Sequence, residues 1–220
     1  MIMKYLRNQF VFVFSILMTF SWLSSASCSA GILEENASNL IQNLGDEAIQ
    51  ILKEYEHKKI SAQEKTKRLR SMIVKKVDFQ RIGLSSLGKY RRQLPKDLIE
   101  KFIQAFEKAV TRTYLEKFEE YNDEHFKVSR SSEMDIGRAK GVIVQSALVR
   151  KTGPKVSLVW IVRQKKDGLI IADLKVEGAS MLQSYRQQHQ GIIGRAKNPI
   201  EGIKELTDIL NSNNAKWEEV

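Results

Sequence analysis

The chain has 220 residues, enough for one or two domains with a substantial hydrophobic core, and its 42% hydrophobic and 28% charged residues exclude a disordered, collagen-like or low-complexity protein. Lys and Arg outnumber Asp and Glu by 36 to 26, so the protein is basic, with a formal net charge of +10. A single Cys excludes a disulfide scaffold and a zinc site built on several thiolates, and a polytopic membrane protein is excluded because only one segment is apolar enough to enter a bilayer.

Residues 1–30 have the pattern of a secretory signal peptide. Two basic residues precede an uncharged apolar run over residues 10–23, and small residues fill positions 24–30. The run is shorter than the ~20 residues that span a bilayer, so a cleaved signal peptide is favoured over an uncleaved membrane anchor. We therefore predict export and a mature domain over residues 31–220.

Two positions suit cleavage of this signal, after Ala26 or after Ala30. Lipidation of Cys28 is a further alternative, and it is disfavoured because Ser25 stands where a lipoprotein signal normally carries Leu or a similar residue. Cleavage after Ala30 removes the single Cys, so the mature protein would be stabilised without disulfides.

Four stretches in the first half of the mature chain place apolar residues three and four apart, as amphipathic helices do. Ser61 and Glu64 form a capping box that begins the second stretch, and Pro95 suits the first turn of the fourth. Gly83 and Gly88 weaken the helical pattern near the end of the third stretch. The expected helices cover residues 33–55, 61–77, 78–90 and 98–121.

After Tyr121 the apolar period changes from 3.6 to 2, which predicts strands. Turn residues join these strands as antiparallel neighbours in a meander, and capping sequences at Ser180 and Asn198 begin two C-terminal helices. Strands flanked by helices indicate an α+β fold, with an antiparallel sheet of about four strands wrapped by N- and C-terminal helices. The expected strands are residues 126–128, 142–148, 156–162 and 170–176.

The sequence contains no convincing catalytic constellation. His57, His125 and His189 have no local metal-ligand spacing, and we expect each of them at the surface or half-buried. A glycine-rich phosphate loop and a nucleophile elbow are both missing, so we expect no cofactor and no metal. A Ser/His/Asp triad stays open as an alternative, because its members meet in space rather than in sequence.

Asp173 is the most interesting acid, because it lies inside an otherwise apolar strand. Strand alternation places Asp173 on the face that carries Lys175, opposite Ala172 and Leu174. An exposed or locally paired carboxylate is therefore favoured over a catalytic base.

The basic surplus concentrates in residues 58–59, 65–70 and 89–92. Such charge can serve nucleic acid, an anionic membrane surface or solubility alone. Export takes the chain away from nucleic acid, so we expect no nucleic-acid partner. The residues by themselves indicate an exported basic α+β domain in which binding is favoured over catalysis.

Four pieces of the chain occur together in one known family. They are D-F-Q-R at residues 78–81, L-G-K-Y-R-R at 87–92, Phe102 with Phe106 in the long helix, and D-L-K-V-E-G-A-S at 173–180 followed by Tyr185 and Arg186. Their order and spacing, over roughly residues 33–210, resemble the MlaC or toluene-tolerance family of periplasmic phospholipid-binding proteins. The chain departs from that family at Arg91, where Trp is usual, and at His189, where Phe is usual.

The resemblance implies a twisted antiparallel sheet wrapped by helices, with an elongated apolar cavity between the layers. It also implies a periplasmic carrier that is not an enzyme and that binds a phospholipid. Such a carrier passes its lipid between an outer-membrane lipoprotein complex and an inner-membrane ABC transporter complex. We expect a monomer that contacts these membrane-bound partners transiently.

Strand parity and the stripe of the long helix indicate which residues would line such a cavity, and ordinary core packing is an equal alternative for each. The lining candidates are Phe102, Phe106, Val110, Tyr114, Val142, Val144, Leu148, Leu158, Trp160 and Leu174. The candidates for headgroup binding or docking are Arg91, Arg92, Tyr185 and Arg186. For Arg186, a structural ion pair is favoured over a phosphate contact.

Two other classes of protein stay open. Small cone-shaped isomerases and dehydratases combine a sheet with helices, and they would need an acid or a His inside the apolar cavity. A basic adaptor that binds envelope proteins through its helices is the second alternative.

Export with cleavage is directly testable. We expect the intact mass of the protein from the cell envelope to lack the first 26 to 30 residues, because the segment before Ala26 or Ala30 is a signal peptide. A full-length mass, or a lipid-modified Cys28, would contradict this prediction.

Overall fold

The computed structural model describes residues 25–119, 124–137, 139–150 and 154–218. Most of the predicted signal peptide therefore lies outside the described residues, and residues 25–30 form the start of the first helix. Of the helices that the structure describes, none is both long enough and apolar enough to span a membrane.

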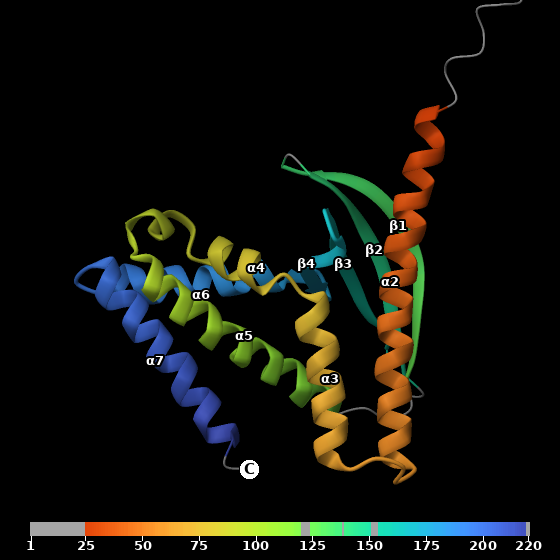
Figure 1. Cartoon of the computed structure of the whole chain (residues 1–220), viewed down its shortest axis with the longest axis horizontal. Helices are drawn as coiled ribbons and strands as arrows, with labels where there is room; N and C mark the ends of the chain where they lie inside the picture. The colour runs from red at the N-terminus through yellow and green to blue at the C-terminus, as the bar shows by residue number, and fades with distance from the viewer. Residues whose placement is uncertain (1–24, 120–123, 138, 151–153, 219–220) are drawn as a thin grey trace, which may run out of the picture.

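The described chain forms helices, then a sheet, then two more helices (Figure 1). The N-terminal helices are α2 (Ser25–Glu56), α3 (Ala62–Lys76), α4 (Phe79–Ser86), the 3-10 helix η1 (Gly88–Gln93) and α5 (Lys96–Glu119). The strands are β1 (His125–Ile136), β2 (Ala139–Val149), β3 (Val156–Lys165), β4 (Gly168–Val176) and β5 (Ala179–Ser180), and α6 (Met181–Arg195) and α7 (Pro199–Glu218) follow.

The five strands make one antiparallel sheet in the order β1-β2-β3-β4-β5. This confirms the predicted α+β fold and the meander, to which the structure adds the two-residue strand β5. Strand β1 is much longer than the predicted residues 126–128, since its second half is polar and shows no apolar alternation. Pairing with β2 holds that half in the sheet, with a register shift between Val128 and Arg130.

Helix starts follow the predicted capping residues. The Ser61, Ser180 and Asn198 side chains each accept a hydrogen bond from a backbone N–H of the turn that follows. The predicted third helix divides into α4 and η1 at Gly88, whose φ of 56° lies in the left-handed region and ends the helical path. The predicted end of the long helix at Tyr121 lies outside the described residues.

Helices close both long edges of the sheet. Along β1, the Gln42 side chain of α2 accepts from the Val128 N–H (2.9 Å), and Glu34 accepts from the Glu133 N–H (2.8 Å). At the other edge, Val77 forms a parallel bridge with Ile171 of β4. Unpaired strand edges invite association with other chains, so these contacts also protect the edges from such association.

The core lies between one face of the sheet and the helices. Val142, Val144 and Val162 of this face are fully buried, and so are Phe102 and Phe106 of α5. Figure 1 shows α4, α5, α6 and α7 gathered beside the β4 end of the sheet, whereas α2 runs along β1 and β2. The sheet face is thus covered in two parts by helices that come before and after it in sequence.

Gly45 sets how closely α2 approaches the sheet. A Cβ atom at Gly45 would lie 2.1 Å from Cδ1 and 2.5 Å from Cγ of the Phe126 ring in β1. Such distances are impossible without movement of the ring or of the helix. The glycine therefore lets the helix backbone pack directly on an aromatic ring.

We expect Gly45→Ala to lower the free energy of unfolding by about 1–3 kcal/mol, because the methyl group overpacks the contact with Phe126. The matched control is Gly191→Ala in α6, where an added Cβ meets no heavy atom within 4 Å. That change should raise stability by up to ~1 kcal/mol through helix propensity. Urea unfolding of both variants checks the prediction, and equal stabilisation by both would contradict it.

Candidate functional site

The ten predicted lining residues lie on α5 and on the helix-covered face of the sheet. Residue pairing across the strands places Val144 opposite Trp160, and Trp160 opposite Leu174. Six of the ten are buried and four are half-buried. The buried ones are Phe102, Phe106, Val110, Val142, Val144 and Leu174, and the half-buried ones are Tyr114, Leu148, Leu158 and Trp160.

The half-buried strand residues continue into a surface that we call the open apolar face, made of Phe126, Leu148, Leu158, Trp160 and Val176. Phe126 pairs with Leu148, and Leu158 pairs with Val176, which is 37% exposed. Along the strands, the apolar face thus passes from full burial near Val144 to incomplete cover by the helices.

Trp160 is the largest member of the open apolar face. Its indole N–H donates to the Ser146 hydroxyl at 2.8 Å, and its ring meets the Phe126 ring edge-on at 6.4 Å between centroids. The buried polar atom is therefore paired, and the rest of the indole contributes apolar surface.

Tyr114 lies where α5 meets the start of α6. Its hydroxyl donates to the sulfur of Met181 at 3.2 Å, a weak acceptor. Burial, assisted by nearby Tyr185 and Asp173, raises the pKa of Tyr114 well above its ordinary value. Tyr114 is thus neutral at physiological pH, which suits an apolar environment.

His189 is buried, so the prediction of a surface or half-buried position is wrong. Its ring packs edge-on against Phe102 and Phe106, at 5.3 and 5.5 Å between centroids, and stacks on Tyr185 at 5.7 Å. The sequence did contain an indication of this burial, because His189 stands where the family named in the sequence analysis usually has Phe. It fills that aromatic position.

One hydrogen bond orients His189 within the aromatic cluster. Ser86 donates its hydroxyl proton to the Gly83 carbonyl (2.7 Å), so we assign the 2.8 Å contact between the Ser86 Oγ and His189 Nδ1 as donation from the ring N–H. A serine that donates elsewhere is not poised for attack on a substrate. Burial lowers the pKa of His189 from 6.5 to about 4, so the ring is neutral at pH 7.

Asp173 is also buried, and the alternative of a locally paired carboxylate describes it. It accepts hydrogen bonds from the N–H groups of Leu174 (2.9 Å) and Leu182 (3.0 Å), and from the Ser180 hydroxyl (2.6 Å). Asp173 pairs with Ile161 on the outer face of the sheet, next to a register shift that leaves Ala172 without a partner in β3. A left-handed turn at Glu177 and Gly178 leads the chain back, so that the start of α6 covers the carboxylate.

The proposed headgroup and docking residues divide into two kinds. Arg91, Arg92 and Arg186 are exposed, and η1 contacts α6, which brings their two elements together. No ion pair of Arg186 is seen among the residues that the structure describes, and its role stays a prediction. Tyr185 is half-buried, with its pKa raised to about 12 by desolvation, and belongs to the aromatic cluster.

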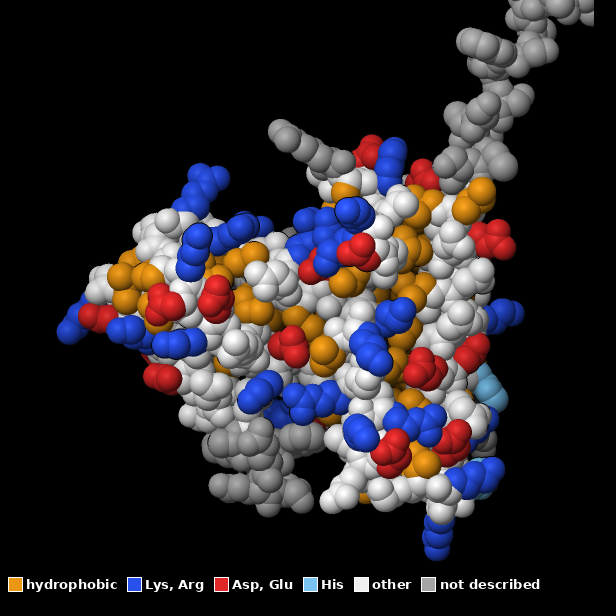
Figure 2. All heavy atoms as spheres, in the orientation of Figure 1, with side chains coloured by type: hydrophobic (Ala, Val, Ile, Leu, Met, Phe, Trp, Pro, Cys, Tyr) orange, Lys and Arg blue, Asp and Glu red, His pale blue; other side chains and the backbone are white. Residues whose placement is uncertain are grey.

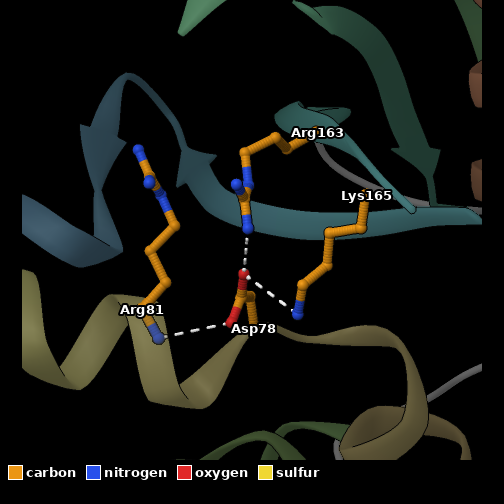
Figure 3. Close-up of polar contacts among 4 residues, drawn as sticks. All are labelled: Asp78, Arg81, Arg163 and Lys165. Atoms are coloured by element: carbon orange, nitrogen blue, oxygen red, sulfur yellow. Dashed lines mark hydrogen bonds and ion pairs between the residues drawn. The ribbon is translucent and has the colours of Figure 1, made fainter. Parts of the chain in front are cut away.

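Sequence reasoning missed a charged cluster around Asp78, which joins α4 to the end of β3 (Figure 3). Asp78 is 4% exposed, and its Oδ2 contacts Arg163 Nη2 at 3.0 Å and Lys165 Nζ at 3.6 Å. Its Oδ1 accepts from the backbone N–H of Arg81 at 3.3 Å and so caps α4. The available signal was the i, i+2 spacing of Arg163 and Lys165, which points both side chains to one side of a strand.

Within the described ranges, no group of three or more His, Cys, Asp or Glu side chains could hold a metal ion. The buried carboxylates Asp78, Asp173 and Glu124 already hold helix starts or basic side chains. What the described residues offer is an incompletely covered apolar face and, on other elements, exposed basic side chains.

Comparison with known proteins shows to which protein family this chain is related. The sequence profile described as "MlaC protein" matches residues 42–212, most of the chain. The chain belongs to the MlaC family. This confirms the resemblance that the motifs carried. Among curated proteins, none matches the chain.

A solved structure shares the fold. The phospholipid-binding protein from Ralstonia solanacearum, whose structure contains a phospholipid, aligns with a TM-score of 0.67 and 18% sequence identity. The alignment covers 82% of this chain and 98% of the Ralstonia chain. The fold of this MlaC protein is thus that of the Ralstonia protein over nearly the whole length of the latter.

The buried histidine makes stability depend on pH. The folded-state pKa of His189 is lowered to about 4 from 6.5, so protons bind the unfolded chain first and favour unfolding as the pH falls. The stabilisation is complete above pH 6.5 and is lost as the pH falls toward 4, about 3 kcal/mol in all. Urea unfolding at pH 7 and at pH 4.5 measures this loss.

The informative variant is His189→Phe, because it keeps an aromatic ring and leaves the Ser86 hydroxyl bonded to Gly83. We expect the variant to lose much less stability than the wild type between the two pH values. His57→Gln, at an exposed position, is the control and should behave as the wild type does. Equal losses in wild type and His189→Phe would contradict the assignment.

Proposed function

We propose that this protein binds a phospholipid, with its acyl chains in an apolar cavity between α5 and the covered face of the sheet. The observation that carries the proposal is the open apolar face, where large apolar side chains continue the core without full cover. Membership of the MlaC family and the phospholipid in the Ralstonia protein both support a lipid as the ligand.

Acyl chains suit this surface on energetic grounds. Each CH₂ group that leaves water contributes about 0.8 kcal/mol, so two chains bound against Val, Leu and aromatic side chains are held without any polar contact. A large apolar surface on an otherwise well-packed protein generally marks a binding site. The ten lining candidates remain our proposal for the residues that contact the chains.

We propose that the protein is periplasmic and carries its lipid between an outer-membrane lipoprotein complex and an inner-membrane ABC transporter complex. The exposed Arg91, Arg92 and Arg186 then lie where η1 and α6 meet, and their charge suits anionic membranes or acidic partner surfaces. Tyr185 is better assigned to the aromatic core than to the headgroup. A monomer suits a carrier that has to detach from each membrane.

The rival classes receive less support. An isomerase or dehydratase would need an acid on the apolar face, and the Asp173 carboxylate lies on the other face, bonded to the start of α6. The adaptor alternative accounts for the exposed arginines but leaves the open apolar face without a purpose.

Lipid extraction tests the proposal directly. We expect organic extracts of the purified protein to contain a two-chain phospholipid by mass spectrometry, and Val144→Trp to reduce that content sharply with little change in melting temperature. The physical reason is that the indole occupies the volume of acyl carbons. In a solid core, the same overpacking costs about 1–3 kcal/mol and lowers the melting temperature.

Gln145→Trp is the matched control, since the neighbouring side chain is exposed and points to the opposite face of β2. It should leave the lipid content unchanged. A lipid-free wild type would contradict the proposed function. A Val144→Trp protein with a lower melting temperature and an unchanged lipid content would contradict a cavity at Val144.

A further inference from the structure

We propose that Arg81, Arg163 and Lys165, held around Asp78, form a binding site for a phosphate-type anion. The anion is either the phosphodiester of a lipid headgroup or free inorganic phosphate, and the first of these rests on the proposed function. Figure 2 shows Lys and Arg side chains gathered over the region where α4 meets the β3–β4 hairpin. None of these three residues was among the candidates for the headgroup.

The cluster has more positive charge than its own carboxylate neutralises. Asp78 is nearly fully buried and contacts Arg163 and Lys165 through a single oxygen, Oδ2. Its other oxygen is occupied by the Arg81 backbone N–H, so the Arg81 guanidinium is not neutralised by Asp78. The exposed Asp167 in the hairpin turn is the other acid close in sequence to Lys165. The described cluster therefore carries three cations around one buried carboxylate.

Donors remain free in the same place. The Nε of Arg163 is buried and has no hydrogen-bond partner among the described residues, although the side chain as a whole is 19% exposed. The Arg81 side chain likewise has no partner in the described part of the chain, and Figure 3 shows it extending from α4 beside the Arg163 side chain. A buried guanidinium N–H without an acceptor is unfavourable, so a movement of the Arg163 side chain that brings this N–H to an anion would be favourable.

The chemistry of these donors selects a phosphate-type group. Guanidinium groups present planar pairs of N–H donors that match two oxygens of a phosphate, and Lys adds a point charge. The ion pairs with Asp78 already hold the Arg163 and Lys165 side chains in position, so these side chains lose less conformational entropy when an anion binds. Its negative charge also keeps the cations from repelling one another when no anion is bound.

The test uses the delipidated mature protein and the variants Arg81→Gln and Lys165→Gln. Arg81→Gln is preferred to a change at Arg163, because it keeps the partners of the buried Asp78 carboxylate. In one arm, inorganic phosphate is titrated by calorimetry at constant ionic strength. In the other, protein loaded from phosphatidylglycerol vesicles releases lipid to phosphatidylcholine acceptor vesicles. Arg70→Gln, which removes one exposed charge from α3, is the control.

We expect Arg81→Gln to weaken phosphate binding or to speed lipid release about tenfold, as the loss of one charge-assisted hydrogen bond predicts, and Arg70→Gln to do neither. An effect on release assigns the site to the headgroup, and an effect on the titration alone assigns it to free phosphate. If neither Arg81→Gln nor Lys165→Gln changes either measurement, or if Arg70→Gln has the same effect, the anion site is wrong. A wild type that loads no lipid contradicts the proposed function alone, and the phosphate titration then decides the anion site.

Discussion

An antiparallel sheet with one apolar face has to be covered by helices, and every other feature of this protein follows from how that cover is provided. The helices come from both sides of the sheet in sequence, with α2 along β1 and β2, and α4 and α6 against β4. Where they meet the strands, Val142, Val144 and Val162 are fully buried. Where they do not, Leu158 stays half-buried and Val176 is exposed, and this uneven cover is the physical basis for proposing an apolar ligand.

The same helices satisfy the backbone of the sheet edges. Gln42 and Glu34 of α2 accept hydrogen bonds from β1, and the segment that begins α4 pairs with β4 at Ile171. Unpaired strand edges can template association with other chains, and these contacts leave fewer edge groups unpaired. Close approach of α2 to β1 depends on Gly45, which leaves room for the Phe126 ring.

Three of the buried ionisable side chains, Asp78, Asp173 and His189, serve structure in three different ways. Asp173 holds the start of α6, His189 fills an aromatic position as a neutral ring, and Asp78 caps α4 while holding two cations. The hydrogen bonds of Asp173 and the donated proton of Ser86 leave neither group arranged as a catalytic base or nucleophile. The cluster at Asp78 differs from the other two, because its positive charge exceeds the charge of its carboxylate.

The sequence by itself determined the α+β class, the order of the elements, the capping residues and the family, since apolar period and capping chemistry are local properties of the chain. It also determined the face on which Val144, Trp160 and Leu174 lie, because side chains alternate between the two faces along a regularly paired stretch of strand. Only the tertiary structure decided that Asp173 and His189 are buried and that β1 extends through a polar stretch. Burial of those side chains depends on a turn at Gly178 and on helices distant in sequence. The ion pair between Asp78 and Arg163 could not be predicted from the sequence either. The two residues are 85 positions apart, and the strand pairing that brings them together is not encoded by any local pattern.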